Sequence, residues 1–390
     1  MHELAGELAS RGQVVTLLAP SPDLKTPCVV QQTRPFKVVR YRTGSIKSAP
    51  LYVRAINEML LSATAWWRTR AVLDKEGYDL AIFYSPSIFF GPLIAFLKRR
   101  CHLPTYLVLR DIFPDWAVQA GVLRRGPAYF IFKLFERLQY VVADRIGVET
   151  KGSVEYFRNS AQFSKVELLR NWTCTNLARP PVDRSFRCKL GLEHKTVFLY
   201  GGNIGVAQDM DNIVRLARRM EGMSDVHFLL IGAGSEVGRL KTLSAAGKVK
   251  NITILPPVDQ SDYLSLISQF DVGLISLDKR LQSFSTTGKL LGYLRCRLPV
   301  LASVNPGNEL MDLLTASGAG LCSWNGDDDA FFQNALCLCS PSVRREIADR
   351  SRALLEVEFS VQAAADRILR IGSALANVHL ESSVNARAGN

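Results

Sequence analysis

The sequence lacks an apolar run long enough to cross a membrane. Its longest, Ile88–Leu97, has ten residues, about half of the ~18 to 20 that span a bilayer. The first residues also lack the charged start and apolar centre typical of a signal peptide. We therefore expect no membrane-spanning helix and a cytoplasmic location.

Cysteine and histidine are too scattered to suggest a metal site. The eight cysteines include no C-x-x-C pair, and the five histidines show no metal-ligand spacing. We expect reduced thiols without a disulfide framework, and neither a metal nor another cofactor.

Acidic residues are scarce in the first half of the chain. Residues 1–190 carry 28 Lys+Arg and 15 Asp+Glu, a net charge of +13, whereas residues 191–390 carry 20 and 21, a net charge of −1. This asymmetry indicates an anionic partner, such as a membrane surface or a phosphorylated lipid. Scattered, solvated cations explain it about as well. Nucleic acid is disfavoured, because the charge forms no run of five or six residues and no recognition motif accompanies it.

The sequence does contain a repeated alternation of short β-rich apolar runs with longer amphipathic segments, which is typical of parallel sheets covered by helices on both faces. A chain of 390 residues is long enough for two such domains. We predict an α/β fold with two doubly wound, Rossmann-like domains. The predicted strands are Val14–Pro20, Val38–Arg42, Asp79–Tyr84, Thr105–Asp111, Arg145–Thr150 and Lys165–Asn171, then Thr196–Gly202, His227–Gly232, Asn251–Leu255, Asp271–Leu277, Leu298–Ser303 and Gly318–Ser323. The predicted helices are Leu51–Lys75, Phe89–Arg100, Pro127–Val142, Gly152–Asn159, Ser342–Val357 and Val361–Ala376.

The predicted organisation has five parts. They are a first domain (1–172), a polar linker with two adjacent prolines (173–184), a second domain (185–357), a C-terminal helix (358–378) and a disordered tail (379–390). The chain opens on a helix, where a doubly wound domain normally opens on a strand and a Gly-rich loop. Either the first strand of this domain is missing or the true start lies upstream.

Ligands of open parallel sheets bind beyond the carboxyl ends of the strands, and four such ends in the second domain are unusual. The first follows Tyr200 in "YGGNIGVAQDMDN". Its glycines are expected to let backbone N–H groups face an anion at a helix start: Gly201, Gly202 and Gly205. Asn203 and Gln208 would add neutral hydrogen bonds. The alternative is a glycine turn that merely reverses the chain.

The second and third ends carry weaker signals. "IGAGSE" holds Gly232 and Gly234 but lacks the third glycine of a dinucleotide fingerprint, and residues 237–258 contain no Asp or Glu to bind a ribose. A dehydrogenase is therefore disfavoured, and a bland strand-to-helix turn remains possible here. After the third strand, Val258 lies where a base or ribose would rest on the backbone.

The fourth end is "FSTTGKLLGYLRCRLPVLA". Three residues can cap a helix that begins near Gly288: Ser285, Thr286 and Thr287. Lys289 then stands in the first turn, the wrong end of a helix for a cation because of the macrodipole. An anion at this helix start would reverse the unfavourable sign, as in a phosphate-binding loop. The alternative is a lysine that simply points to solvent.

In the first domain, the strand that ends in "LVLRDIFPDWA" is the informative one. Arg110 and Asp111 lie at its carboxyl end, and Asp115 and Trp116 follow in the loop. A carboxylate there can orient a sugar hydroxyl or accept a proton. A structural Arg110–Asp111 pair is nearly as good an interpretation.

Together these segments resemble glycosyltransferase family 4, and within it the bacterial O-antigen and capsule group of the fucosamine-transferase type. The resemblance spans nearly the whole chain and rests on "MHELAGELASRG", "LRDIFPDWA", "ADRIGVET", "RNW", "YGGNIGVAQDMDNI", "IGAGSE" and "GKLLGYLRCRLPVLA". The family implies two Rossmann-like domains facing across a cleft, the GT-B architecture. It also implies retaining, metal-independent transfer from a nucleotide sugar, with UDP as the expected nucleotide. The final helix would return to the first domain.

The resemblance also implies residue roles. Lys289 and Asp111 would be catalytic, Lys289 as the principal cation on the diphosphate. Donor-binding residues would be Gly202, Asn203, Gly205, Gln208, Gly232, Gly234, Val258, Ser285, Thr286, Thr287, Gly288, Lys289 and Leu290. Acceptor-binding residues would be Arg110, Asp115 and Trp116. A polyprenyl-phosphate-linked or saccharide acceptor, met at the inner face of the cytoplasmic membrane by a peripherally bound enzyme, would fit the charge asymmetry.

The chain departs from the family at three places. Asn203 and Gln208 stand where many members carry Arg and Lys, and Gly292 stands where many place a ribose-binding glutamate. The first strand with its glycine loop is missing as well. The alternatives are therefore a non-catalytic or N-terminally truncated nucleotide-sugar-binding homologue, and a nucleotide-sugar epimerase. The epimerase is disfavoured, because no histidine stands at a strand end with acidic partners.

Overall fold

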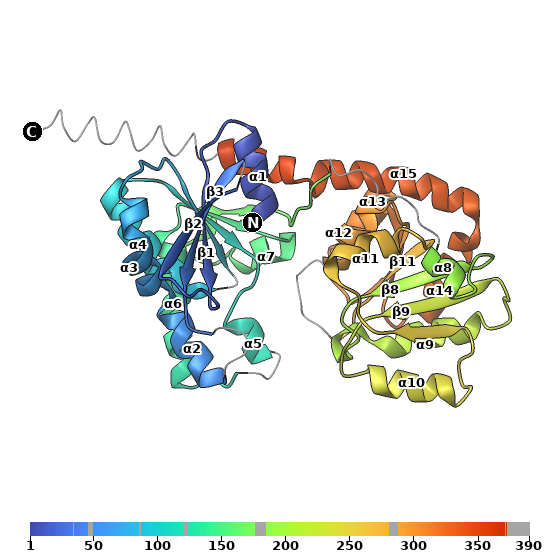
Figure 1. Ribbon diagram of the computed structural model, residues 1–390. Coiled ribbons are helices and arrows are strands. Elements are labelled where there is room, and N and C mark those ends of the chain that lie inside the picture. Colours follow the sequence, from blue (N-terminus) through green and yellow to red (C-terminus); the bar gives the residue numbers. More distant parts are fainter. Residues whose placement is uncertain are drawn as a thin grey trace, which may run out of the picture. The chain divides into compact units, whose positions relative to one another are not determined.

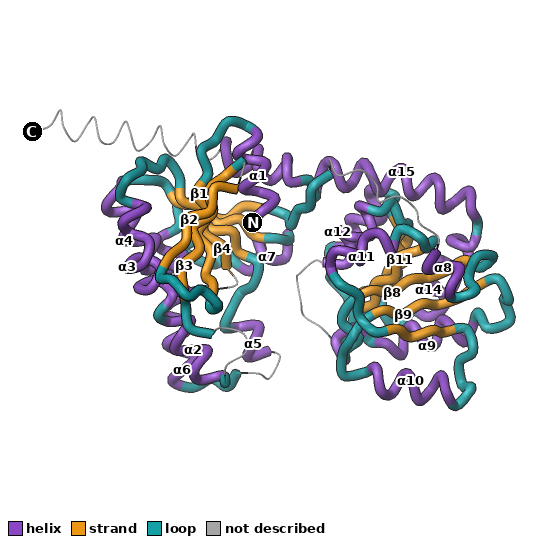
Figure 2. The backbone as a smooth tube through the Cα atoms, in the orientation of Figure 1, coloured by secondary structure: helices purple, strands orange, loops and turns teal. Residues whose placement is uncertain are grey.

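The computed structural model describes residues 1–33, 35–45, 50–85, 87–119, 123–175, 185–280, 288–370 and 372. The chain forms two compact units. Unit 1 comprises Met1–Asn171 with Val361–Asn390, and unit 2 comprises Trp172–Ser360. Each unit has strands surrounded by helices (Figures 1 and 2). Within the described residues, no helix is both long and apolar enough to span a bilayer. Residues 176–184 of the expected linker lie outside the described residues. So do residues 371 and 373–378 of the expected C-terminal helix and the whole expected tail (379–390).

Unit 1 contains two sheets. Its strands are β1 (Thr16–Ser21), β2 (Cys28–Thr33), β3 (Phe36–Arg42), β4 (Ala81–Ser85), β5 (Thr105–Leu109), β6 (Arg145–Val148) and β7 (Val166–Leu168). The first sheet has the order β1-β3-β2 and the second has the order β4-β5-β6-β7. Among the described strands of unit 1, only β2 runs antiparallel to its neighbour. The sequence pattern missed β2 because its last four side chains are exposed and mostly polar.

The helices of unit 1 connect and cover these strands. They are α1 (His2–Ser10), α2 (Leu51–Met59), α3 (Leu61–Leu73), α4 (Gly91–Cys101), α5 (Asp115–Gln119), α6 (Pro127–Val142) and α7 (Lys151–Tyr156), with short 3₁₀ turns at Ile88–Phe90 and Phe163–Lys165. The prediction of one helix over Leu51–Lys75 is wrong, because the helix is interrupted at Leu60.

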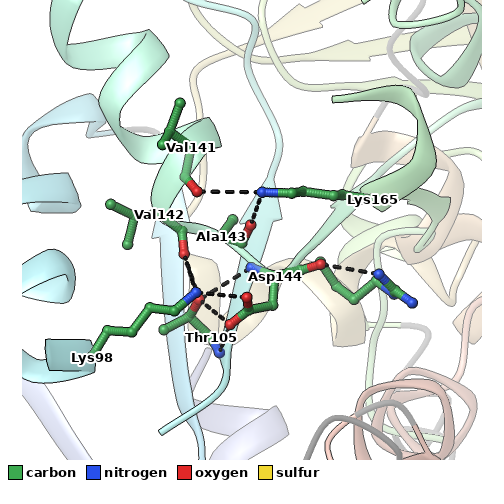
Figure 3. A network of polar contacts seen from close by, with 8 residues as sticks. Lys98, Thr105, Val141, Val142, Ala143, Asp144 and Lys165 are labelled. Carbon is green, nitrogen blue, oxygen red and sulfur yellow. Dashed lines mark hydrogen bonds and ion pairs between the residues drawn. The ribbon is translucent and has the colours of Figure 1, made fainter. Parts of the chain in front are cut away.

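A polar network fastens the amino ends of β5 and β6 (Figure 3). The Asp144 carboxylate accepts hydrogen bonds from the Thr105 backbone N–H at 2.9 Å and from Lys98 Nζ at 2.6 Å. Thr105 Oγ1 donates to the Val142 carbonyl at 2.8 Å. Desolvation would raise the pKa of Asp144, but the bonds that its carboxylate accepts from Lys98 and Thr105 outweigh it and lower that pKa. The network fixes the strand whose opposite end carries Arg110 and Asp111.

The helical segment 361–370 packs on unit 1. Gln362 Nε2 donates to Glu7 Oε2 at 3.1 Å, and Arg11 donates to the Gln362 carbonyl at 3.2 Å. Arg11 also pairs with Asp366, and Arg367 donates to the Leu168 carbonyl. These contacts join the end of the described chain to α1 and β7.

Unit 2 contains one parallel sheet. Its strands are β8 (Thr196–Gly201), β9 (Val226–Ile231), β10 (Ile252–Leu255), β11 (Val272–Ser276), β12 (Val300–Val304) and β13 (Gly320–Trp324). Its helices are α8 (Ser185–Lys189), α9 (Met210–Arg219), α10 (Val237–Ala245), α11 (Gln260–Ile267), α12 (Gly288–Arg295), α13 (Leu310–Ser317), α14 (Asp328–Cys339) and α15 (Pro341–Glu358), with a 3₁₀ turn at Val206–Gln208.

The sheet of unit 2 is buried on both faces. Along β8, Val197 and Leu199 belong to one hydrophobic core, whereas Phe198 and Tyr200 belong to the other. This alternation is what a strand with helices on both faces requires. Residues of α11, α12, α13 and α15 fill the first core, and residues of α9, α10 and α14 fill the second.

Candidate functional site

The strand order of unit 2 defines where a ligand is expected to bind. The sheet runs β10-β9-β8-β11-β12-β13, so the chain builds outward from β8 in one direction and then restarts at β11 in the other. This order is the doubly wound one, whose ligand crevice lies outside the carboxyl ends where the direction reverses. The loops after β8 and β11 therefore flank the expected site.

Lys289 lies beside the loop after β8. A Cβ atom placed on Gly202 would lie 3.0 Å from Lys289 Cε, and Lys289 Nζ lies 4.7 Å from the centre of the Tyr200 ring. Burial lowers the pKa of Lys289 to about 8. Among the described residues, no carboxylate lies within ion-pair distance of it. A desolvated cation in the first turn of α12 has an unfavourable environment that a bound anion would relieve.

The loop after β8 does not offer the row of free amides that the sequence suggested. The N–H of Gly201 donates to Tyr293 Oη, that of Gly202 to the Ile231 carbonyl, that of Ile204 to the Ala233 carbonyl and that of Gly205 to Gln208 Oε1. Among the five described N–H groups from Gly201 to Gly205, that of Asn203 is the one left without an acceptor. The expectation that the N–H groups of Gly201, Gly202 and Gly205 face outward is therefore wrong, because these groups fasten the loop to its neighbours.

Asn203 and Gln208 bond to each other. Asn203 Nδ2 donates to Gln208 Oε1 at 2.9 Å, the same oxygen that accepts from Gly205. Both side chains lie in the loop after β8, at the carboxyl edge of the sheet. Their hydrogen bonds hold that loop in shape. Their contact with a donor stays a prediction.

Gly232 and Gly234 are required by close backbone packing. A Cβ atom on Gly232 would lie 1.7 Å from the Gly202 carbonyl oxygen, and one on Gly234 would lie 2.2 Å from the Ile204 carbonyl oxygen. The loop after β9 therefore packs directly on the loop after β8. This contact gives both glycines a structural role, and their direct contact with a donor stays a prediction.

A buried amide ties three strand ends together, and sequence reasoning missed it. Asn325, just after β13, donates to Asp209 Oδ2 at 2.9 Å and to the Leu277 carbonyl at 2.8 Å. Asp209 adopts a left-handed conformation with φ of 38°, and its carbonyl accepts from Ser276. The signal in the sequence is one polar residue at the end of each strand, which is too common to single out.

The remaining predicted donor residues differ in placement. Val258 is half-buried and packs against the first core of unit 2. Gly288 is exposed at the start of α12, whereas the Leu290 side chain is fully buried in that core. Leu290 can therefore face a ligand only through its backbone. Ser285, Thr286 and Thr287 lie outside the described residues.

Gly292 lies in α12 beside the ring of Tyr263. A Cβ atom on Gly292 would lie 3.5 Å from Tyr263 Cε1, an ordinary contact. The hydroxyl of Tyr293 is fully buried and accepts from the Gly201 N–H at 3.1 Å. Sequence reasoning missed both tyrosines, because aromatic residues on helices more often fill a core than face a ligand.

In unit 1, Arg110 and Asp111 follow β5. Arg110 donates to the Leu169 carbonyl at 2.8 Å and to the Arg170 carbonyl at 3.3 Å, so it fastens the exit of β7. The Asp111 carboxylate is exposed and accepts no hydrogen bond from the described residues. Partial desolvation raises the pKa of Asp111, while the charge of Arg110 opposes this rise.

The Asp115 carboxylate is fully engaged within unit 1. It accepts hydrogen bonds from Tyr129 at 2.9 Å, Lys133 at 3.1 Å and Tyr156 at 2.5 Å. These bonds hold α5 to α6 and α7 and lower the pKa of Asp115 against desolvation. Trp116 lies in α5, and its side chain is outside the described part of the structure. The acceptor roles of both residues stay predictions.

The first 172 residues match a known family. Residues 1–172 fit the family described as glycosyl transferase 4-like domain. WbjE of Pseudomonas aeruginosa, named as a probable glycosyltransferase, is 23% identical over 223 residues, 56% of this chain and 55% of its own length. WcaI of Escherichia coli K12, named as a glycosyl transferase of colanic acid biosynthesis, is 23% identical over 206 residues, 50% of each. The chain spans about half the length of these curated relatives. The matches support the resemblance to glycosyltransferase family 4.

A solved structure shows the same fold. HepE of Anabaena, crystallised with UDP, matches with a TM-score of 0.62 and 16% identity over 87% of this chain and 86% of its own. At this identity the likeness shows the fold alone. The prediction of an α/β fold with two Rossmann-like domains is confirmed, and a cleft between them stays a prediction.

Proposed function

We propose that the protein is a retaining glycosyltransferase that moves a sugar from a UDP-sugar to a lipid-linked or growing polysaccharide acceptor of the cell surface. The main observation in support is Lys289, a desolvated cation beside Gly202. It lies near the carboxyl ends of β8 and β11, where the strand order of unit 2 changes direction. The UDP complex of HepE and the name of WcaI support the choice of donor and product class.

The proposed chemistry needs one cation and no protein nucleophile. Negative charge builds on the diphosphate as the sugar–phosphate bond breaks, and Lys289 stabilises that charge from a fixed position. The acceptor hydroxyl attacks on the face that the diphosphate leaves, and the leaving phosphate takes its proton. Asp111 orients sugar hydroxyls. Neither a metal nor a cofactor takes part in the proposed reaction.

The proposal predicts the behaviour of Lys289→Ala. With UDP-sugars and a membrane extract as acceptor, this variant should release UDP about 10²-fold more slowly than the parent, the scale of removing one transition-state donor. Nuclear magnetic resonance of the product should show the anomeric configuration of the donor. Near-parental turnover in the variant would remove Lys289 from the mechanism, and an inverted product would exclude retention.

Helix α6 supports the acceptor proposal, because several of its large apolar side chains face solvent while a glutamate is buried. Phe130, Leu134 and Val141 are 68%, 67% and 60% exposed, whereas Glu136 is 1% exposed. Glu136 is held inside by Lys133 and Tyr140. A solvent-facing stripe of large apolar side chains is typical of a helix that rests in a lipid interface.

Basic residues surround this stripe. Arg137 is exposed between Leu134 and Val141 on the same face, and Arg124 and Arg125 are exposed just before α6. Cations beside apolar side chains attract an anionic bilayer, each contributing about 1 kcal/mol near the surface. We therefore assign the α6 stripe, defined as Phe130, Leu134, Arg137 and Val141, to contact with an anionic lipid surface.

A matched pair of variants tests the α6 stripe. Phe130→Glu combined with Leu134→Glu should lower sedimentation with phosphatidylserine-containing vesicles at least tenfold, with an unchanged melting temperature because both side chains are exposed. The control is Val14→Glu, which also charges an exposed apolar residue (94%) of unit 1 and should leave sedimentation unchanged. Equal loss in both variants, or none in either, would contradict the assignment.

The second candidate function is a non-catalytic protein that binds nucleotide sugars. The observation in its favour is the loop after β8, where the N–H groups of Gly201, Gly202, Ile204 and Gly205 already bond within the unit. It predicts that UDP-sugars raise the melting temperature while no sugar is transferred. Sugar transfer above the rate of a boiled sample would exclude it.

A further inference from the structure

Two glycines at the carboxyl edge of unit 2 have no conformational reason to be glycine. Gly201 ends β8 and Gly292 lies inside α12, and neither has a positive φ. A glycine weakens both a strand and a helix relative to alanine. What the two positions share is a neighbour, the ring of Tyr263 on α11.

The Tyr263 ring occupies the space in front of both glycines. A Cβ atom on Gly201 would lie 2.3 Å from Tyr263 Oη, a distance that no real contact reaches. A Cβ atom on Gly292 would lie 3.5 Å from Tyr263 Cε1. Gly201 must therefore be glycine for the hydroxyl to stay where it is, and any longer side chain at 292 would grow toward the same ring.

The buried hydroxyl of Tyr293 lies beside the Tyr263 hydroxyl. Tyr293 Oη accepts from the Gly201 N–H at 3.1 Å and donates to the Leu274 carbonyl at 3.2 Å or to the Leu199 carbonyl at 3.3 Å. Burial raises the pKa of Tyr263 to about 12, so its hydroxyl is neutral at pH 7. Because the single Tyr293 proton goes to a backbone carbonyl, the Tyr263 oxygen keeps a lone pair that can accept from a hydroxyl of a ligand.

The position of this hydroxyl indicates what it binds. Gly201, beside Tyr263, is followed directly by Gly202, beside Lys289. The neutral Tyr263 hydroxyl and the desolvated Lys289 ammonium group therefore lie beside adjacent residues of the backbone. A nucleoside diphosphate presents the same pair of features, ribose hydroxyls next to a diphosphate.

We propose that the Tyr263 hydroxyl binds the ribose of the nucleotide while Lys289 binds its diphosphate. This inference rests on the proposed function, and it extends that function to a residue that no motif had indicated. At position 292 an alanine would still fit beside the Tyr263 ring, whereas a longer side chain would extend toward it.

Calorimetric titration of UDP and of its 2′-deoxy and 3′-deoxy forms tests this inference. Tyr263→Phe keeps the ring and removes the hydroxyl, so it should weaken UDP binding about 3- to 10-fold, the range expected for one hydrogen bond. For at least one deoxy form, parent and variant should bind equally, because the partner hydroxyl is already absent. The control is Tyr78→Phe in unit 1, which should bind UDP like the parent.

The outcomes separate the two proposals. If the parent binds UDP and Tyr263→Phe binds it equally well, the role of Tyr263 is wrong and the proposed function stands. The role is also wrong if the variant weakens UDP and both deoxy forms by the same factor. If the parent binds no nucleoside diphosphate, the proposed function fails, and the ribose contact fails with it.

Discussion

At the scale of single residues, the proposed function depends most on Lys289. Its ammonium group is desolvated, lies 4.7 Å from the Tyr200 ring centre and stands in the first turn of α12. The ring face offers a cation weak support, which does not replace lost hydration. We expect such a residue to destabilise the free protein, and the proposed diphosphate would offset that cost.

Replacing this lysine should therefore stabilise the free protein. Lys289→Met keeps most of the side-chain volume and removes the buried charge, so we expect the melting temperature without ligand to rise by about 2–4 °C, the shift that ~1 kcal/mol gives a domain of this size. Differential scanning calorimetry measures it. A lower melting temperature would mean that the ammonium group stabilises the fold.

The pKa of Lys289 also predicts a pH dependence of UDP binding. A diphosphate binds the ammonium form, so its own presence raises the pKa above the value of about 8 in the free protein. Affinity should be constant from about pH 7 to 7.5 and fall above pH 8, by up to tenfold per pH unit. Titrations at several pH values show this break.

Lys289→Arg is the control for this pH dependence. A guanidinium group stays charged throughout this range, so its affinity for UDP should not change between pH 7 and 9. A break near pH 8 that persists in Lys289→Arg would have to come from another group.

Sequence reasoning found Lys289 because its position conflicts with a general rule about helix dipoles. It missed Tyr263 and Asn325, whose positions conflict with none. A tyrosine on an amphipathic helix and a polar residue after a strand are ordinary, and only their distances to Gly201 and Asp209 show that they contact the segment after β8. Long-range contacts of this kind leave no local pattern.

At the scale of elements, the site depends on two loops that pack backbone against backbone. Gly232 and Gly234 bring the loop after β9 against Gly202 and Ile204. The prediction that glycines mark this edge was correct in position. The assumed reason, free amides for an anion, was wrong, because hydrogen-bond satisfaction inside a loop depends on neighbours that the local sequence does not specify.

Adding one methyl group at this loop contact should disrupt it. Gly232→Ala places a Cβ atom 1.7 Å from the Gly202 carbonyl oxygen, so we expect a loss of about 1–3 kcal/mol in unfolding free energy and a loss of UDP affinity. Urea unfolding and calorimetry measure the two effects.

Gly238→Ala is the matched control for this loop variant. Gly238 lies in α10 with no atom within 4 Å of its added Cβ, so the change should stabilise the protein by about 0.5–1 kcal/mol. Equal behaviour of the two alanine variants would contradict the close packing of the loops.

Element predictions succeeded where the periodicity was strong. All six strands of unit 2 were predicted within a few residues, because strands buried on both faces form continuous apolar runs. The failures lie in unit 1, where β2 has exposed polar side chains and α2 is separated from α3 at Leu60. The amphipathic pattern continues across that interruption, so the sequence does not show it.

At the scale of the whole molecule, the two halves of the chain differ in net charge. The basic excess lies in residues 1–190, and unit 1 also carries the α6 stripe. The nearly neutral second half carries Lys289 and its glycine loops. This division matches a protein that meets an anionic surface with one unit and binds a soluble nucleotide with the other.

The central claim is that unit 2 binds a nucleoside diphosphate through Lys289. Calorimetric titration of UDP at pH 7 into the parent and Lys289→Met tests it most directly. We expect one UDP to bind per parent chain and Lys289→Met to bind UDP at least tenfold more weakly. Equal binding by both proteins, or no binding of UDP, GDP or ADP to the parent, would contradict it.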